Sequence, residues 1–283
     1  MRNTKKILTP ELMETYFLFL RERERADNTI RKYRRDLTAL CRWLDGRHLT
    51  KERMIEWKEC LTASYAAVSV NSMLAAAQGF LRFMGWQDMS VRPLKIQKNM
   101  FRDESRELTR KEYIRLVETS RRGKNERLAL VLQSICATGI RVSELSFITV
   151  RAVRAGRAVI RNKGKWRTVF LPAKLCGRLK AYLRKEGREE GSVFVTRTGR
   201  PLDRSNIWRE MKRLCESADV LPKKVFPHNL RHLFARTYYS IEKDISRLAD
   251  ILGHSDIGTT RIYTRESGRI HARQLERMGL VIT

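Results

Sequence analysis

Residues 137–145 read ATGIRVSEL, a stretch that sets Arg141 at a break between two helical patterns. The helical pattern of residues 125–137 stops at Gly139 and resumes directly after the arginine. Arg141 is therefore expected near a helix start, where free backbone N–H groups and the helix dipole favour an anion. Glu144, three residues further on, is in position to orient the guanidinium.

Downstream of this break, the spacing at which apolar residues recur changes over residues 157–171. Two short runs rich in β-branched and aromatic residues flank the polar segment 162–165, which predicts a hairpin with a basic tip. Residues 192–196 are expected to add a third strand. The remainder reads helical through Leu275, so the second domain is expected to be mixed and mainly α.

Upstream, residues 1–90 are predicted to form a small helical domain, because apolar residues recur at three- and four-residue intervals. The four expected helices cover Leu8–Arg25, Thr29–Leu44, Thr50–Leu61 and Val70–Met84. Residues 91–106 lose this periodicity and form the expected linker. Residues 107–283 then form the second domain, with a C-terminal tail at 266–283. The predicted fold class is mainly α with a small β-sheet (α+β), in two domains.

The composition indicates a polyanionic partner. Lys and Arg number 59 against 31 Asp and Glu, a formal net charge of +28, and both halves of the chain are basic. A merely solvated surface explains this charge less well than nucleic acid does, because excess acid would serve solubility at least as well. No stretch approaches the roughly 20 apolar residues of a membrane span, and the N-terminus leads into no apolar signal core. A cytoplasmic protein without a membrane partner is expected.

The five cysteines are odd in number, widely scattered and never spaced as Cys-x-x-Cys. They are expected to be reduced thiols with mostly structural roles. Metal binding by them is not expected, and we expect the protein to need neither a metal nor another cofactor.

Six side chains in the second domain have the chemistry that phosphate transfer requires. They are Arg141, Lys163, His228, Arg231, His254 and Tyr263. Each alone has an ordinary explanation: a surface charge, a hairpin-tip solubiliser, a hydrogen-bonded helix pair, an imidazole at a helix C-terminus or a packed core ring. Their joint occurrence in one order, within a strongly basic chain, favours a single active site.

The order of these residues and the motifs around them resemble those of the tyrosine recombinases and integrases. The motifs are ATGIRVSEL at 137–145, PHNLRH at 227–232 and LGHSDIGTTRIYT at 252–264. The resemblance is strongest over residues 106–265. Within the family, the sequence is most similar to short Xer-like and mobile-element recombinases. The helical first domain would correspond to the core-binding, SAM-like DNA-binding domain of that family.

The resemblance implies that Arg141 and Arg231 are the arginine pair, His228 and His254 the catalytic histidines, and Tyr263 the nucleophile. It also implies a 3′-phosphotyrosyl bond, a free 5′-hydroxyl and a Holliday junction intermediate. The residue types suit this chemistry, because two planar guanidiniums clamp phosphate oxygens and stay charged. A histidine can help to remove the phenolic proton, and the second can hydrogen-bond a phosphate oxygen. The aryl phosphate ester keeps the energy of the broken bond, so rejoining needs no ATP.

Lys163 is the hairpin lysine that the resemblance implies, and it suits a general acid for the leaving oxygen. The hairpin of the family usually reads Gly-Lys-Gly-x-Lys-x-Arg, whereas this chain is one residue shorter over 162–167. Lys165 therefore stays open as an alternative. Cations stand where a metal nuclease would have carboxylates, so activity in EDTA is expected.

The resemblance further implies double-stranded DNA as partner and a homo-oligomer, a tetramer on two DNA sites. The tail at 266–283 has apolar residues at helical spacing, and docking on its own domain or on a neighbouring protomer both stay open. The alternatives are a type IB-like topoisomerase and a non-catalytic DNA-binding relic of an integrase. The helical first domain and the presence of all six residues favour a recombinase, whether for integration, excision or dimer resolution.

Overall fold

The computed structural model describes residues 6–97, 104–162, 165–254, 256–264 and 276–277. The chain divides into two compact units, residues 1–98 and 99–283, called here the first and the second unit. The finer domain boundaries expected from the sequence stay a prediction.

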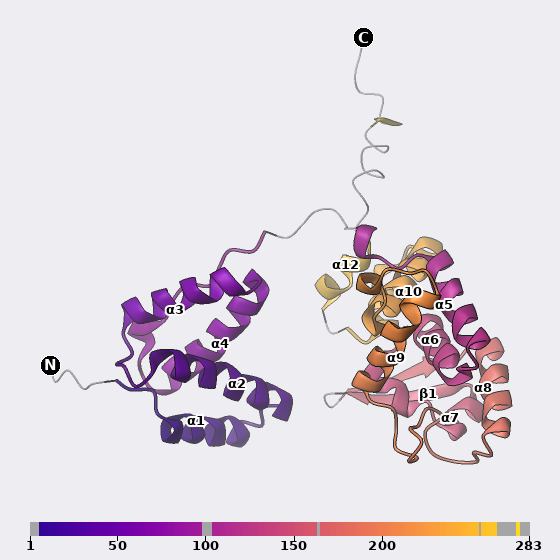
Figure 1. Ribbon diagram of the computed structural model, residues 1–283, viewed down its shortest axis with the longest axis horizontal. Helices are drawn as coiled ribbons and strands as arrows, with labels where there is room; N and C mark the ends of the chain where they lie inside the picture. The colour runs from indigo at the N-terminus through magenta and orange to yellow at the C-terminus, as the bar shows by residue number, and fades with distance from the viewer. Residues whose placement is uncertain (1–5, 98–103, 163–164, 255, 265–275, 278–283) are drawn as a thin grey trace, which may run out of the picture. The chain divides into compact units, whose positions relative to one another are not determined.

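The first unit is helical in its described part, with four α-helices and one short 3-10 helix (Figure 1). They are α1 (Pro10–Glu22), α2 (Asp27–Leu44), α3 (Lys51–Ser64), α4 (Ala67–Phe83) and η1 (Gln87–Met89). The Thr9 and Thr50 side chains accept hydrogen bonds from the first turns of α1 and α3, which fixes both starts locally. The large side chains of Phe17, Trp57 and Phe80 are almost fully buried between these helices. The four predicted helices are confirmed.

The second unit is also mainly helical, and its elements follow one another closely. They are η2 (Glu104–Arg106), α5 (Arg110–Arg122), α6 (Glu126–Thr138), η3 (Val142–Phe147), α7 (Val150–Ala155), β1 (Arg157–Asn162), β2 (Lys165–Phe170), α8 (Ala173–Lys185), α9 (Arg204–Ser217), η4 (Pro222–Lys224), α10 (Pro227–Glu242), α11 (Ile245–Leu252), η5 (Ile257–Thr259) and α12 (Arg261–Thr264). Thr109 and Glu112 form a capping box at the start of α5.

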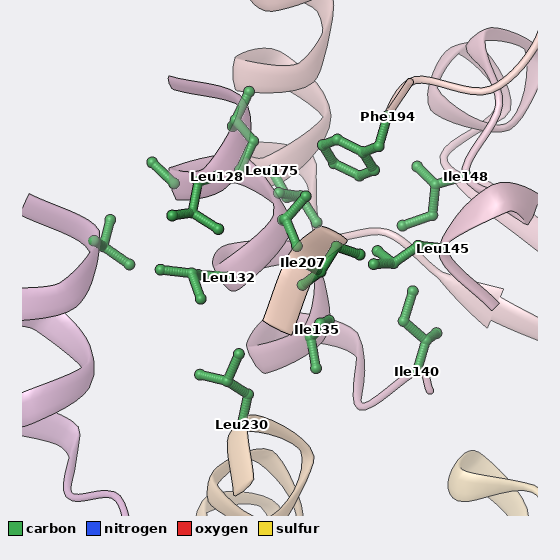
Figure 2. Close-up of a cluster of buried hydrophobic side chains, with 14 of the residues drawn as sticks. Leu128, Leu132, Ile135, Ile140, Leu145, Ile148, Leu175, Phe194, Ile207 and Leu230 are labelled. Atoms are coloured by element: carbon green, nitrogen blue, oxygen red, sulfur yellow. The ribbon is translucent and has the colours of Figure 1, made fainter. Parts of the chain in front are cut away.

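Helix α6 forms the centre of the second unit. Five consecutive residues, 128–132, are buried, and a helix that is apolar on all sides must be covered on all sides. Helices α5, α8, α9 and α10 contact it. Leu132 and Ile135 of α6 lie beside Leu230 of α10 in one apolar cluster (Figure 2). The buried α6 thereby fixes the position of the chain that leaves its C-terminus towards Arg141.

Strands β1 and β2 form the predicted hairpin. They pair antiparallel, from Arg157 opposite Phe170 to Asn162 opposite Lys165. Ala158 and Val169 point into the core, whereas alternate residues such as Phe170 are exposed. Hairpin and helices together confirm the predicted fold class, mainly α with a small sheet.

The predicted third strand is wrong. Within the described residues the sheet has two strands, and the segment 192–196 makes only isolated bridges, Ser192 with Thr149 and Val195 with Pro201. The apolar residues that suggested a strand serve the core instead, since Phe194 is 1% exposed and points into the cluster around α6 (Figure 2).

All five cysteines are free, as the sequence predicts. Within the described ranges, we find no helix with the length and apolar character that crossing a membrane requires.

Candidate active site

Arg141 stands at the N-cap of the 3-10 helix η3, in the extended conformation. Its neighbours Ile140 and Leu145 are buried and anchor the segment in the core (Figure 2). The backbone N–H of Arg141 donates to Glu144 Oε2 at 2.8 Å, and its guanidinium donates to Glu144 Oε1 at 3.0 Å. A third of the arginine side chain remains exposed, 33%. The expected helix start and the expected partner are both confirmed, although the helix is 3-10 rather than α.

Arg231 is 1% exposed and lies on α10. Its guanidinium donates to the backbone carbonyls of Gly139 at 2.5 Å and Leu252 at 2.8 Å. The same Nη2 lies 2.9 Å from Nε2 of His254. These bonds hold the end of α6, the end of α11 and the His254 ring around one cation.

Gly139 allows α10 to approach the end of α6 closely because it has no side chain. Its φ is +65°, and a Cβ there would lie 2.4 Å from Cδ1 of Phe234. Glycine therefore both ends α6 in the left-handed conformation and lets α10 pack against the chain reversal.

Burial lowers the pKa of Arg231 to about 10, and the charge of Arg141 acts in the same direction. The Tyr263 side chain opposes this fall through its electrostatic interaction and a hydrogen bond with the guanidinium. The guanidinium nevertheless stays protonated at neutral pH, because a pKa near 10 lies well above it.

The His254 ring is held by both nitrogens. Nε2 faces an arginine nitrogen, which can only donate, so Nε2 accepts and Nδ1 carries the proton. Nδ1 then donates to the hydroxyl of Thr260 at 2.8 Å. Burial, followed by the charges of Arg231 and Arg141, lowers the pKa of His254 to about 4. The ring is neutral at pH 7 and accepts a hydrogen bond from Arg231, while its expected hydrogen bond to a phosphate oxygen stays a prediction.

Tyr263 lies on α12 and is 3% exposed. Its ring packs edge-on against His232 at a centroid distance of 4.7 Å and roughly parallel to His254 at 6.1 Å. Ala235 and Leu248 complete the small apolar cluster around it. The structure therefore brings the candidate nucleophile next to the Arg231 guanidinium within one protomer.

His228 stands one turn before His232 on α10 and is exposed to solvent. The two rings meet edge-on at 4.6 Å, so the imidazole of His232 lies between His228 and Tyr263. Surrounding protein atoms, followed by Arg231 and Arg141, lower the pKa of His228. Burial, then the charge of His228, lowers the pKa of His232 to about 4. Sequence reasoning gave His232 no role, although its i, i+4 spacing from His228 puts both on one helix face.

Arg167 is a second residue that sequence reasoning missed. It lies on β2, and its Nη2 donates to Glu144 Oε2 at 2.5 Å. Glu144 is 2% exposed and would have a raised pKa through burial alone. The Arg141 N–H and the charges of Arg167 and Arg141 outweigh burial and lower the Glu144 pKa. One buried carboxylate thus holds two arginines.

Lys163 lies outside the described residues, and so does most of the tail at 266–283. The side chain of Lys165 is likewise not described, so both lysines remain candidates. Among the residues that the structure covers, no cluster of three His, Cys, Asp or Glu side chains has the form of a metal site. Five of the six candidate residues are therefore placed, and Arg141, Arg231, His254, His228 and Tyr263 all lie around one end of α10.

Comparison with known proteins defines the class that this fold and site represent. Residues 106–269 match the model of the phage integrase family, and residues 13–88 match the N-terminal SAM-like domain of phage integrases. These matches lie within the second and the first unit respectively.

Individual proteins agree with the family match. Tyrosine recombinase XerA of Pyrococcus furiosus is 28% identical over 98% of this chain and 97% of its own length. XerA of Thermococcus onnurineus is 30% identical over 90% of each. Among solved structures, a lambda integrase tetramer bound to a Holliday junction has a TM-score of 0.73 at 17% identity, covering 89% of this chain and 76% of that one. The chain belongs to the phage integrase family of tyrosine recombinases.

Proposed function

We propose that this chain, a site-specific tyrosine recombinase acting on DNA, breaks and rejoins DNA strands through a covalent bond between Tyr263 and a backbone phosphate. The observation that carries the proposal is the packing of the Tyr263 phenol beside the Arg231 guanidinium and between two neutral imidazoles. A phosphodiester repels nucleophiles until fixed cations neutralise its charge. Arg141 and Arg231 are those cations.

In the cleavage step, the phenolic oxygen forms a bond to phosphorus while the bond from phosphorus to the DNA 5′ oxygen breaks. The phenolic proton passes to the neutral imidazole of His228, and His232 lies between this ring and the phenol. The leaving oxygen takes up a proton from Lys163. Both imidazoles have lowered pKa values, so they are unprotonated at neutral pH and able to accept. Joining reverses these steps, since the 5′-hydroxyl displaces a phenol, which leaves readily.

Covalent trapping tests the proposal and works with DNA whose recombination site has not been mapped. Sheared genomic DNA from the host is incubated with the protein, and denaturing gels followed by sequencing report the fragments bound covalently. Tyr263→Phe is expected to bind DNA and form no adduct, because only the phenolic oxygen is removed. The matched control is Tyr239→Phe, a partly buried tyrosine of the same cluster, which should still form the adduct. An adduct that persists with Tyr263→Phe refutes the proposal.

The arginine clamp also predicts cleavage without a metal. Guanidiniums stabilise the charge that a metal ion would otherwise carry, so adduct formation should proceed in EDTA. A strict requirement for Mg²⁺ would contradict this mechanism.

We further propose double-stranded DNA as partner and a tetramer on two sites as the recombining assembly, in line with the tetrameric lambda integrase structure. Deletion of residues 268–283 should impair recombination between two sites more than it impairs DNA binding. Equal loss of both would argue against a role of the tail in assembly. Joining of two separate sites, rather than relaxation of supercoils alone, distinguishes a recombinase from a topoisomerase.

A further inference from the structure

Arg167 connects three segments that surround the active site. Its Nη2 donates to Glu144 Oε2 at 2.5 Å, and its Nη1 donates to the backbone carbonyl of Ile251 near the end of α11. The partners lie 23 and 84 positions away in sequence. One side chain of the hairpin therefore joins η3 to the helix end that precedes His254.

We propose that Arg167 is a positioning residue for strand cleavage: it holds the carboxylate that orients Arg141 and the helix end that presents His254. This inference rests on the proposed function of the site. It extends that function to a residue that acts through its neighbours rather than through the DNA.

The Arg167 side chain packs closely against the end of α11. The side chain is 14% exposed. Gly253, directly before His254, has a φ of +65°, and a Cβ there would lie 2.6 Å from Cδ of Arg167. The absence of a side chain at Gly253 lets the arginine stem pass over the end of α11.

The hydrogen-bond partners of Arg167 separate its role from that of the phosphate clamp. Both terminal nitrogens already donate to protein acceptors, Glu144 and the Ile251 carbonyl. Arg141 differs, because a third of its side chain is open to solvent. A planar guanidinium can hold a carboxylate and a carbonyl at fixed directions at once, which the single ammonium of lysine cannot copy.

Two arginines bind neighbouring carbonyls at the end of α11. Arg167 binds the carbonyl of Ile251, and Arg231 binds the next carbonyl, that of Leu252. Cations are favoured at this negative end of a helix dipole. Removal of Arg167 leaves the Ile251 carbonyl and the Glu144 carboxylate each with one partner fewer, so Arg141 and His254 lose their fixed relative position.

The test compares cleavage of two substrates at the site found by covalent trapping. One is normal DNA, and the other has a methylphosphonate at the cleaved position, where a methyl group replaces a charged oxygen. Arg167→Met is expected to slow single-turnover cleavage of normal DNA about 100-fold, as misplacement of a catalytic group by about 1 Å does. On methylphosphonate DNA, most of the slowing caused by Arg167→Met should disappear, because the two guanidiniums of the phosphate clamp then have less negative charge to neutralise. Arg141→Met provides the benchmark for the same relief.

An arginine that served only the fold would slow both substrates equally, and this result would overturn the inference. Normal rates on both substrates would overturn it as well. Arg167→Lys keeps the charge and the aliphatic stem, so it replaces Arg167→Met in the test if Arg167→Met fails to fold. Its cleavage is again expected to be slow on normal DNA and largely restored on the methylphosphonate. If the wild-type protein itself forms no adduct, the proposed function fails rather than this inference alone.

A second readout needs no DNA. Charged or titratable groups face His254 from α10 (Arg231, His228), η3 (Arg141), β2 (Arg167) and α12 (Tyr263). NMR titration of the ring should show a raised His254 midpoint in Arg167→Met, because the charge of Arg167 lowers the pKa of His254. The matched control is Arg204→Met, which removes a cation that acts on His228 and should raise only the His228 midpoint. An unchanged His254 midpoint in Arg167→Met would contradict the proposed contact.

Discussion

Replacement of Glu144 by glutamine tests how much its two ion pairs contribute to the stability of the protein. The carboxylate is 2% exposed and binds Arg141 at 3.0 Å and Arg167 at 2.5 Å. At an effective dielectric constant of about 20, each pair contributes about 5–7 kcal/mol of attraction before desolvation. Desolvation cancels much of this, but removal of one partner from a buried pair costs about 3–5 kcal/mol. Because Arg141 keeps partial exposure, we expect Glu144→Gln to lower the free energy of unfolding by about 3 kcal/mol.

The assay is urea unfolding of the full-length chain, with hydrogen exchange in peptides from α6 reporting the second unit. For a unit of this size, about 3 kcal/mol corresponds to a fall in melting temperature of about 6–12 °C. The control Glu118→Gln removes an exposed carboxylate of α5 whose ion pair spans 3.9 Å, and no measurable change is expected. A loss below about 1 kcal/mol for Glu144→Gln would refute the reasoning.

The pH dependence gives an independent check of the same prediction. The folded protein lowers the pKa of Glu144 from its ordinary value of 4.5, so its stabilising effect is complete above that pH. It is lost as pH falls through the lowered folded value. The difference in stability between wild type and Glu144→Gln should therefore be constant near neutrality and shrink in acid. A difference independent of pH down to full protonation would contradict the assignment.

Three further perturbations have defined outcomes. The His254 ring, with a pKa of about 4, should show no NMR titration between about pH 6 and 8, and a midpoint near the ordinary value would disprove its burial. Gly139→Ala should destabilise the protein by about 1–3 kcal/mol in urea unfolding, because its Cβ would lie 2.4 Å from Phe234 at a positive φ; wild-type stability would show that the chain reversal adapts. Arg231→Lys replaces the two terminal nitrogens that bind Gly139, Leu252 and His254 by a single ammonium nitrogen without the planar fork, so cleavage should fall about 100- to 1000-fold with DNA binding nearly retained, and wild-type cleavage would exclude the clamp.

Local signals in the sequence explain the starts of helices that carry a side-chain cap. Thr9 and Thr109 cap their helices with side-chain contacts to residues three positions away, and such contacts are fully encoded by neighbours. The hairpin likewise followed from its two-residue period. Arg141 and Glu144 form one further local pair, which explains why their geometry was predictable.

Contacts between distant segments were not predictable in the same way. Arg167 reads as an ordinary strand cation, and its two partners become neighbours only when η3 and α11 fold against β2. His232 lies beside Tyr263 only because α12 returns to α10. The segment around Phe194 has strand-like composition, but its side chains fill the core, and composition does not distinguish these two uses.

The lowered pKa values of the three imidazoles around the active site have a consequence for regulation. His232 and His254, with pKa values of about 4, stay neutral from mildly acid to mildly alkaline solution, and the pKa of His228 is lowered as well, so the positive charge next to Tyr263 comes from guanidiniums. Changes in acidity near neutral pH therefore do not add charge to the two rings that flank Tyr263. Whatever restrains strand breakage must operate on access and geometry, at the level where protein and DNA come together.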